Sequence, residues 1–189
     1  MTVTPSEESI VITAASDSKV YDGKPLTNSG YTYTGKLVGD DKLEVTVEGS
    51  RTDAGSEYNV ITGYKIMRGS EDVTKSYKGI ITVNGTLTIE QRKVTLTSAD
   101  DSKEYDGTPL TNDTVTVSGE GFADGEGAAY NVTGSQTLVG SSPNTFSYAL
   151  NAKTKPENYS ITKKEGTLTV TENLTEIIIK ASDAEKKYD

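Results

Sequence analysis

Cysteine and histidine are both missing from the sequence. Their absence excludes disulfides, thiol nucleophiles, Cys/His metal sites, haem ligation and every catalytic triad that uses histidine. Tryptophan is also missing, phenylalanine occurs twice, and only 33% of the residues are hydrophobic. Any hydrophobic core is therefore thin and depends on Tyr, Val, Ile and Leu. No stretch approaches the roughly 18 apolar residues that a membrane-spanning helix needs, so we expect no membrane insertion in this segment.

The charge balance is acidic. The 189 residues include 19 Lys+Arg and 28 Asp+Glu, which gives a formal net charge of −9 at pH 7. Because a nucleic-acid backbone is itself anionic, nucleic acid is not expected as a partner. The N-terminal residues lack the charged and apolar regions of a signal peptide, and we expect residues 1–9 to be a leader segment within a longer protein.

One sequence motif recurs along the chain. Residues 18–28 (SKVYDGKPLTN) return at 102–112 (SKEYDGTPLTN), an offset of 84, and residues 181–189 begin a third copy. A repeat of about 84 residues is too long for one turn of a solenoid and long enough for a small folded domain. Two shorter matches support this period: 47–50 with 132–135, and 85–89 with 166–170.

The repeat predicts tandem domains with a direct junction, because no Pro/Gly/Ser-rich linker separates the two full copies. The expected organisation is a leader over residues 1–9, a first β repeat module over 10–92, a second over 93–172, and the truncated start of a third repeat over 173–189.

Apolar residues alternate with period two inside each copy, as in Leu43–Val47 and Phe146–Leu150, and no stretch has a sustained helical period. The pattern predicts an all-β chain of two tandem immunoglobulin-like β-sandwich modules, each with six or seven short antiparallel strands. β-grasp-like modules are the alternative. In the second copy, 159–162 and 167–170 are expected to form a final hairpin around a turn at 163–166.

The repeated Tyr-Asp-Gly-x-Pro-Leu motif has a structural explanation. Asp-Gly favours a turn, because Gly adopts positive φ freely and Asp can hydrogen-bond nearby backbone, while the Pro fixes φ. The Tyr rings are expected to be buried against their modules, and the Leu side chains to fill the core. The motif residues are Tyr21, Asp22, Gly23, Pro25 and Leu26, with Tyr105, Asp106, Gly107, Pro109 and Leu110.

Two other roles for this region stay open. The motif carboxylates, with Asp17 or Asp101 nearby, could help to hold a hard cation such as Ca²⁺. A Lys with an Asn or Asp on a neighbouring strand could form an intramolecular isopeptide bond. Lys19, Lys103 and Lys187 share a repeat position and are more simply explained as solvated residues of a strand edge. No metal, cofactor or catalytic residue is assigned.

Two acidic loops, 39–41 and 124–127, lack the spacing of a calcium-binding loop, and we interpret both as solvated charge. A pair of carboxylates can hydrolyse glycosidic bonds, but no pair in this sequence is distinguished as one acid and one base. Catalysis is therefore not expected.

The motif and the closing pattern Tyr-x-Ile-x-x-x-x-Gly-Thr-Leu-Thr-Val, at 159–170, resemble the YDG/MBG-type repeats of large bacterial surface proteins. The resemblance covers both copies and the third start, although the first copy departs from the closing pattern at 77–85. It implies extracellular tandem modules on adhesin-like proteins without catalysis of their own.

We therefore expect a monomeric stalk or spacer at the cell surface or cell wall, which presents an adhesive region. Host glycan or protein would then be contacted by the parent molecule. One alternative is a module that itself binds glycan or protein through tyrosines such as Tyr31, Tyr33, Tyr58 and Tyr64. The other is an accessory domain of a secreted polysaccharide enzyme.

Overall fold

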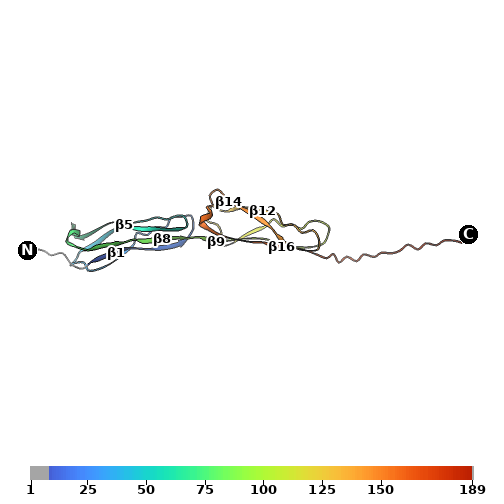
Figure 1. Cartoon of the computed structure of the whole chain (residues 1–189), viewed down its shortest axis with the longest axis horizontal. Helices are drawn as coiled ribbons and strands as arrows, with labels where there is room; N and C mark the ends of the chain where they lie inside the picture. The colour runs from blue at the N-terminus through green and yellow to red at the C-terminus, as the bar shows by residue number, and fades with distance from the viewer. Residues whose placement is uncertain (1–8, 189) are drawn as a thin grey trace, which may run out of the picture. The chain divides into compact units, whose positions relative to one another are not determined.

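The structure, a computed structural model, describes residues 9–188 and is almost entirely β (Figure 1). The all-β prediction is confirmed. Residues 1–8 of the expected leader lie outside the described residues. The first copy (10–92) contains β1 (Ile10–Ala14), β2 (Asp17–Val20), β3 (Tyr31–Thr34), β4 (Lys42–Glu48), β5 (Gly55–Arg68), β6 (Glu71–Asp72), the 3-10 helix η1 (Thr74–Ser76), β7 (Ile80–Val83) and β8 (Gly85–Glu90).

The second copy (93–172) has corresponding elements, and its first strand begins one residue before the predicted boundary. They are β9 (Arg92–Ser98), β10 (Asp101–Glu104), β11 (Val115–Gly119), β12 (Ala128–Val132), β13 (Gly140–Asn144), β14 (Phe146–Leu150), the 3-10 helix η2 (Pro156–Asn158), β15 (Tyr159–Lys164) and β16 (Gly166–Thr171). Each copy therefore has eight strands among the described residues, and β6 has only two residues.

The chain forms two compact units whose boundary crosses the second copy. The first unit comprises the residues up to Leu96 together with Val117–Ala129 and Tyr148–Lys163. The second comprises Thr97–Thr116, Tyr130–Ser147 and the residues from Lys164 onward. The module boundaries inferred from the repeat stay a prediction.

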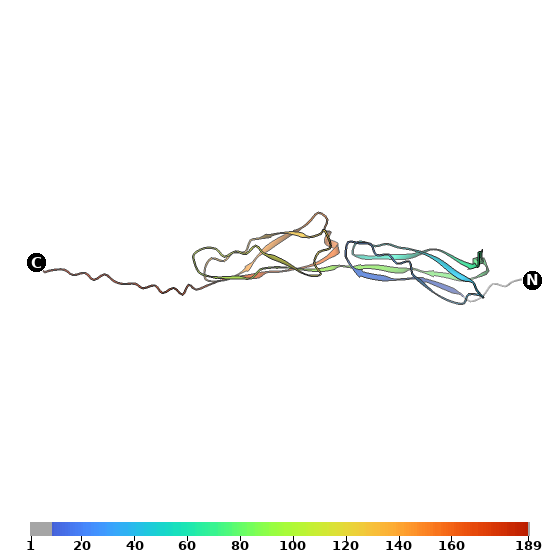
Figure 2. The ribbon, with the colours of Figure 1, turned by 180° about the vertical axis from the view of Figure 1, so that it is seen from behind.

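Strands from the two ends of a copy lie side by side, as the blue and green strands in Figure 2 show. β1 pairs parallel with β7, and β2 pairs parallel with β8. The same arrangement recurs in the second copy, where β10 pairs parallel with β16. Antiparallel pairs join β1 with β3, β8 with β5, β5 with β4 and β6, and β16 with β13. The expectation of antiparallel strands was therefore wrong for β1 with β7, β2 with β8 and β10 with β16.

The predicted final hairpin of the second copy was also wrong. β15 lies in the sheet ordered β11-β9-β15, whereas β16 lies in the sheet ordered β10-β16-β13. Gly166, the first residue of β16, lies against the backbone of Ala99, so the chain crosses from one sheet to the other here and does not reverse.

The core of the first copy follows from the alternation of apolar residues. Ile10, Ile12 and Ala14 of β1 are buried, while the residues between them are only partly buried. Ile10 and Ile12 form one cluster with Ile66 of β5 and Tyr77, and apolar residues of β3, β4 and β7 pack against it. The sheet ordered β3-β1-β7 is thereby packed against the β4–β5 pair. A smaller cluster in the second copy contains Leu110, Leu168 and Val170.

In the first copy, the chain passes from one sheet to another between β1 and β2 and again between β7 and β8. We call β1–β2 the first ribbon, β7–β8 the last ribbon, and the point where both change sheets the strand-crossing node. β1 and β7 share one sheet, while β2 and β8 share another. At the break after β1, Nδ2 of the buried Asn59 donates to the carbonyls of Ala15 (2.8 Å) and Asn28 (2.7 Å). Gly85 lies so close that a Cβ there would overlap the Ala15 carbonyl.

The second copy repeats the node with equivalent residues. Nδ2 of the buried Asn144 donates to the carbonyls of Ala99 (3.0 Å) and Asn112 (2.9 Å). Gly166 takes the place of Gly85, and a Cβ at Gly166 would overlap the Ala99 carbonyl. The sequence repeat at 85–89 and 166–170 thus marks a position where two backbone segments approach so closely that only glycine fits.

Candidate functional site

The first copy of the repeated motif is a turn closed by its own side chains. Gly23 has a φ of +77°, which favours glycine, and the backbone N–H of Lys24 donates to Asp22 Oδ1 (2.9 Å). Lys19 Nζ donates to Asp22 Oδ1 (2.6 Å) and to the carbonyl of Lys24 (2.8 Å). The Lys19 ammonium holds the pKa of Asp22 below its usual value. Pro25 is exposed and its carbonyl also accepts from Lys19 Nζ (3.5 Å).

The second copy of the motif forms the same turn. Gly107 has a φ of +79°, and the backbone N–H of Thr108 donates to Asp106 Oδ1 (2.9 Å). Lys103 Nζ donates to Asp106 Oδ1 (2.8 Å) and to the carbonyl of the exposed Pro109 (3.4 Å). Lys103 and Thr108 both lower the pKa of Asp106. Lys19 and Lys103 lie on β2 and β10, which are edge strands as the sequence predicts, and each lysine also donates within its turn.

The motif leucines are buried and tie each turn to a neighbouring strand. Leu26 exchanges backbone hydrogen bonds with Arg51, at 2.7 and 3.1 Å. Leu110 does the same with Gln136, at 2.8 and 3.1 Å. Each motif is therefore anchored to the segment just before β5 or β13, strands that pair with the last strand of their copy.

The two motif tyrosines differ in burial. Tyr21 is 5% exposed, whereas Tyr105 is 37% exposed. The expectation that both rings are buried against their own modules was therefore wrong for Tyr105. The cause is that Tyr21 is covered by residues of the second copy: its ring meets that of Tyr159 edge-on, with the centroids 5.6 Å apart.

Within the first compact unit, Glu126 joins these two tyrosines. Tyr21 Oη donates to Glu126 Oε1 (2.6 Å), and Tyr159 Oη donates to Glu126 Oε2 (2.9 Å). Burial and the bond to Glu126 raise the pKa of Tyr21 to about 12. The interpretation of 124–127 as solvated charge was therefore wrong for Glu126.

Asp53 forms a second set of bonds in the same unit. Its carboxylate accepts from Lys155 Nζ (2.6 Å) and from Asn158 Nδ2 (2.9 Å), and these bonds lower the pKa of Asp53. Asn158 Oδ1 also accepts from the backbone N–H of Ala54 (2.7 Å). Arg92 Nη1 donates to the carbonyl of Tyr21 (3.2 Å). Together with Tyr21, Glu126 and Tyr159, these residues form what we call the junction cluster.

The first copy contains an equivalent of the Glu126–Tyr159 pair. Tyr77 Oη donates to Asp41 Oδ2 (2.6 Å) and accepts from the backbone N–H of Val38 (2.8 Å). Arg68 completes this pair through two bonds to the Asp41 carboxylate, at 2.6 and 3.0 Å, and Arg68 and Tyr77 lower the pKa of Asp41. Asp41 is buried, so the interpretation of 39–41 as solvated charge was wrong for it.

Sequence reasoning missed Asn59, Asn144, Glu126 and Asp41. A sequence signal was available for Asn59 and Asn144, which stand at an offset of 85. Asp41 and Glu126 each precede, by 36 and 33 positions, a tyrosine that follows a 3-10 helix, which only the structure shows. The match between Val38-Gly39-Asp40-Asp41 and Ala123-Asp124-Gly125-Glu126 was too loose to recognise without the fold.

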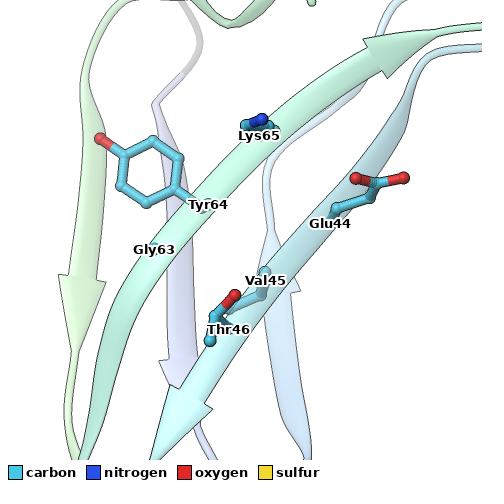
Figure 3. Close-up of a pocket in the computed structure, with 6 residues that line it drawn as sticks. All are labelled: Glu44, Val45, Thr46, Gly63, Tyr64 and Lys65. Atoms are coloured by element: carbon cyan, nitrogen blue, oxygen red, sulfur yellow. The ribbon is translucent and has the colours of Figure 1, made fainter. Parts of the chain in front are cut away.

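Two open grooves on the surface of the described residues involve exposed tyrosines. One is lined by Ser56, Glu57, Thr86 and Tyr58, and Tyr58 is 65% exposed. A second lies between β4 and β5 (Figure 3), where Gly63 stands opposite Thr46 and the ring of Tyr64 extends away from β4. Of the other tyrosines named above, Tyr33 is 44% exposed, while Tyr31 packs against the core.

In comparisons with known proteins, no family model, no curated protein and no solved structure matches this chain. The similarity to YDG/MBG-type repeats therefore stays a prediction. Within residues 9–188, no helix is long and apolar enough to cross a membrane, and no three acidic side chains gather as a metal site requires.

The raised pKa of Tyr21 predicts a loss of stability in alkali. The folded chain retains the Tyr21 proton up to about pH 12, whereas an unfolded tyrosine ionises near 10, so this contribution is complete below pH 10 and is lost as pH rises toward 12. Tyr21→Phe is expected to make the fall in unfolding free energy between these pH values less steep. Chemical denaturation across that range measures it, with Tyr33→Phe as control. An equally steep fall in Tyr21→Phe would contradict the assignment.

Proposed function

We propose that this chain is a tension-resisting tandem-repeat spacer of a bacterial cell-surface protein, without catalysis of its own. It would lie outside the cell and hold an adhesive region away from the surface. The observation that carries this proposal is the parallel pairing of the first and last ribbons of the repeat, β1 with β7 and β2 with β8. The β10–β16 pair recurs in the second copy.

The direction of force explains why this pairing suits a spacer. Tension along the chain pulls the first ribbon of a copy toward its N-terminus and the last ribbon toward its C-terminus. Because the ribbons are parallel neighbours, their hydrogen bonds are sheared together. An antiparallel terminal hairpin would instead open one bond at a time from its end. The four paired positions of β1–β7 and the four of β2–β8 would therefore share the load.

The junction cluster supports the same role. Tyr21 and Asp53 of the first copy bind Glu126, Lys155 and Asn158 of the second. These contacts join two copies that no flexible linker separates, and a spacer built from repeats gains length with each copy.

Single-molecule pulling tests the proposal directly, because the chain has no cysteine and engineered cysteines define the pulling points. In the full chain, Ser9→Cys with Glu90→Cys loads the ribbons in shear. The matched control, Ser9→Cys with Lys78→Cys, pulls the same end of β1 and β7 and peels them apart, since Ile10 pairs with Ile80. We expect an unfolding force higher by roughly twofold or more in the shear geometry. Equal or lower force in shear would overturn the proposal.

A binding module is the second candidate, and the exposed Tyr58 in its groove favours it. An exposed tyrosine offers a flat apolar face with a polar end, which suits a sugar ring. Specific glycan-array binding that Tyr58→Ala abolishes and Tyr33→Ala preserves would favour this candidate over the spacer.

A further inference from the structure

In the first copy, a surface that includes Tyr21 and Asp53 is covered by residues of the second copy. The second copy has an equivalent surface. By the repeat, Tyr105 corresponds to Tyr21, Leu138 to Asp53 and Val139 to Ala54. Leu138 is 70% exposed and Val139 is 51% exposed. We name these three residues of the second copy the docking patch.

The backbone that presents the docking patch matches that of the occupied surface. The N–H of Tyr105 donates to the carbonyl of Thr171 (2.9 Å), as Tyr21 donates to that of Glu90 (2.9 Å). The Tyr105 carbonyl accepts from Asn173 Nδ2 (3.0 Å), as that of Tyr21 accepts from Arg92. The backbone therefore presents the docking patch as it presents the counterpart surface, although the side chains and the residues that cover them differ.

We propose that the docking patch binds the loop end of a further copy of the same repeat, reached through residues 173–188. This inference rests on the proposed spacer function. The incoming loop would present a carboxylate at the Glu126 position to the hydroxyl of Tyr105, and its tyrosine ring, at the Tyr159 position, would cover the Tyr105 ring. Leu138 and Val139 make this contact more apolar than the first junction, where Asp53 pairs with Lys155.

Two observations identify this occupant. The equivalent surface of the first copy is covered by the loop end of the next repeat, through Tyr21–Glu126 and Asp53–Lys155. The sequence after the second copy also begins another repeat. Ile177 and Ile179 stand where Val94 and Leu96 are buried in β9, yet they are 83% and 90% exposed. An exposed apolar segment of this kind requires the rest of a repeat to cover it.

The test extends the chain with its own sequence. Residues 107–172 are appended after Asp189, so that Tyr188 and Asp189 continue as Tyr105 and Asp106 do. Leu138→Cys in the second copy is combined with Asn158→Cys in the appended copy. These two positions correspond to Asp53 of the first copy and Asn158 of the second. Asp53→Cys with Asn158→Cys in the 189-residue chain is the positive control. Leu138→Cys with Asn131→Cys in the appended copy is the matched negative control, since Asn131 is exposed on β12.

We expect the Leu138→Cys pair to form its disulfide about tenfold faster than the negative control under mild oxidation, because docking raises the effective concentration of the two thiols. Hydrogen exchange at 177–179 should slow in the extended chain. Disulfide formation no faster than the negative control, while the positive control reacts, would overturn the proposal, and so would unprotected amides at 177–179. Either failure leaves the shear test unaffected, because that test depends on strand pairing within one copy.

Discussion

Gly85→Ala is expected to destabilise the chain by about 3 kcal/mol or more, because overpacking against rigid atoms is costly and the added Cβ would overlap backbone. The nearest atoms to that Cβ are the carbonyl groups of Ala14 and Ala15, and no flexible side chain is there to move aside. Relief would require the break between β1 and β2 to separate from the start of β8. Chemical denaturation of the full chain measures the loss.

Gly63→Ala is the matched control, since Gly63 also lies in a strand and has ordinary φ. A Cβ there would meet only the Thr46 side chain at 3.8 Å, which is normal van der Waals contact. Its replacement is expected to be neutral or slightly stabilising, because glycine weakens a strand interior. Equal stability of Gly85→Ala and Gly63→Ala would show that the strand-crossing node does not depend on close backbone approach.

The all-β class could be predicted because alternation of apolar residues is a local property of each strand. The turn at Gly23 was accessible for the same reason, since Asp-Gly constrains only a few consecutive residues. The parallel partners of β1 and β2 were not accessible, because Ile10 and Ile80 are 70 positions apart and nothing in a single strand specifies its neighbour. An amphipathic strand has the same pattern in a hairpin and in a parallel pair.

The environment of the charged residues could not be predicted from the sequence for a similar reason. Asp41 and Glu126 look like loop carboxylates in the sequence, yet each accepts a hydrogen bond from a tyrosine more than 30 positions away. The difference between Tyr21 and Tyr105 depends on an adjacent copy, so identical motifs could not reveal it.

Asn59→Ala is expected to cost about 2–5 kcal/mol of unfolding free energy. One side chain supplies the donor to two carbonyls, those of Ala15 and Asn28, and each buried acceptor that loses its donor costs about 1–3 kcal/mol. Asn59 is 0% exposed, so water does not reach the site without rearrangement. Asn131→Ala, at an exposed strand position, is the control and should change stability by less than about 0.5 kcal/mol. A loss no larger than that of the control would contradict the assignment.

The double variant with Asn144→Ala tests whether the two nodes are independent. Asn59 bonds to Ala15 and Asn28, while Asn144 bonds to Ala99 and Asn112, so the two side chains share no partner. Their effects should then add to within about 0.5 kcal/mol. A markedly smaller combined loss would mean that one broken node already releases the other. The repeat would then act as one cooperative unit through the junction cluster, and Asp53→Ala should restore additivity by breaking the contacts with Lys155 and Asn158.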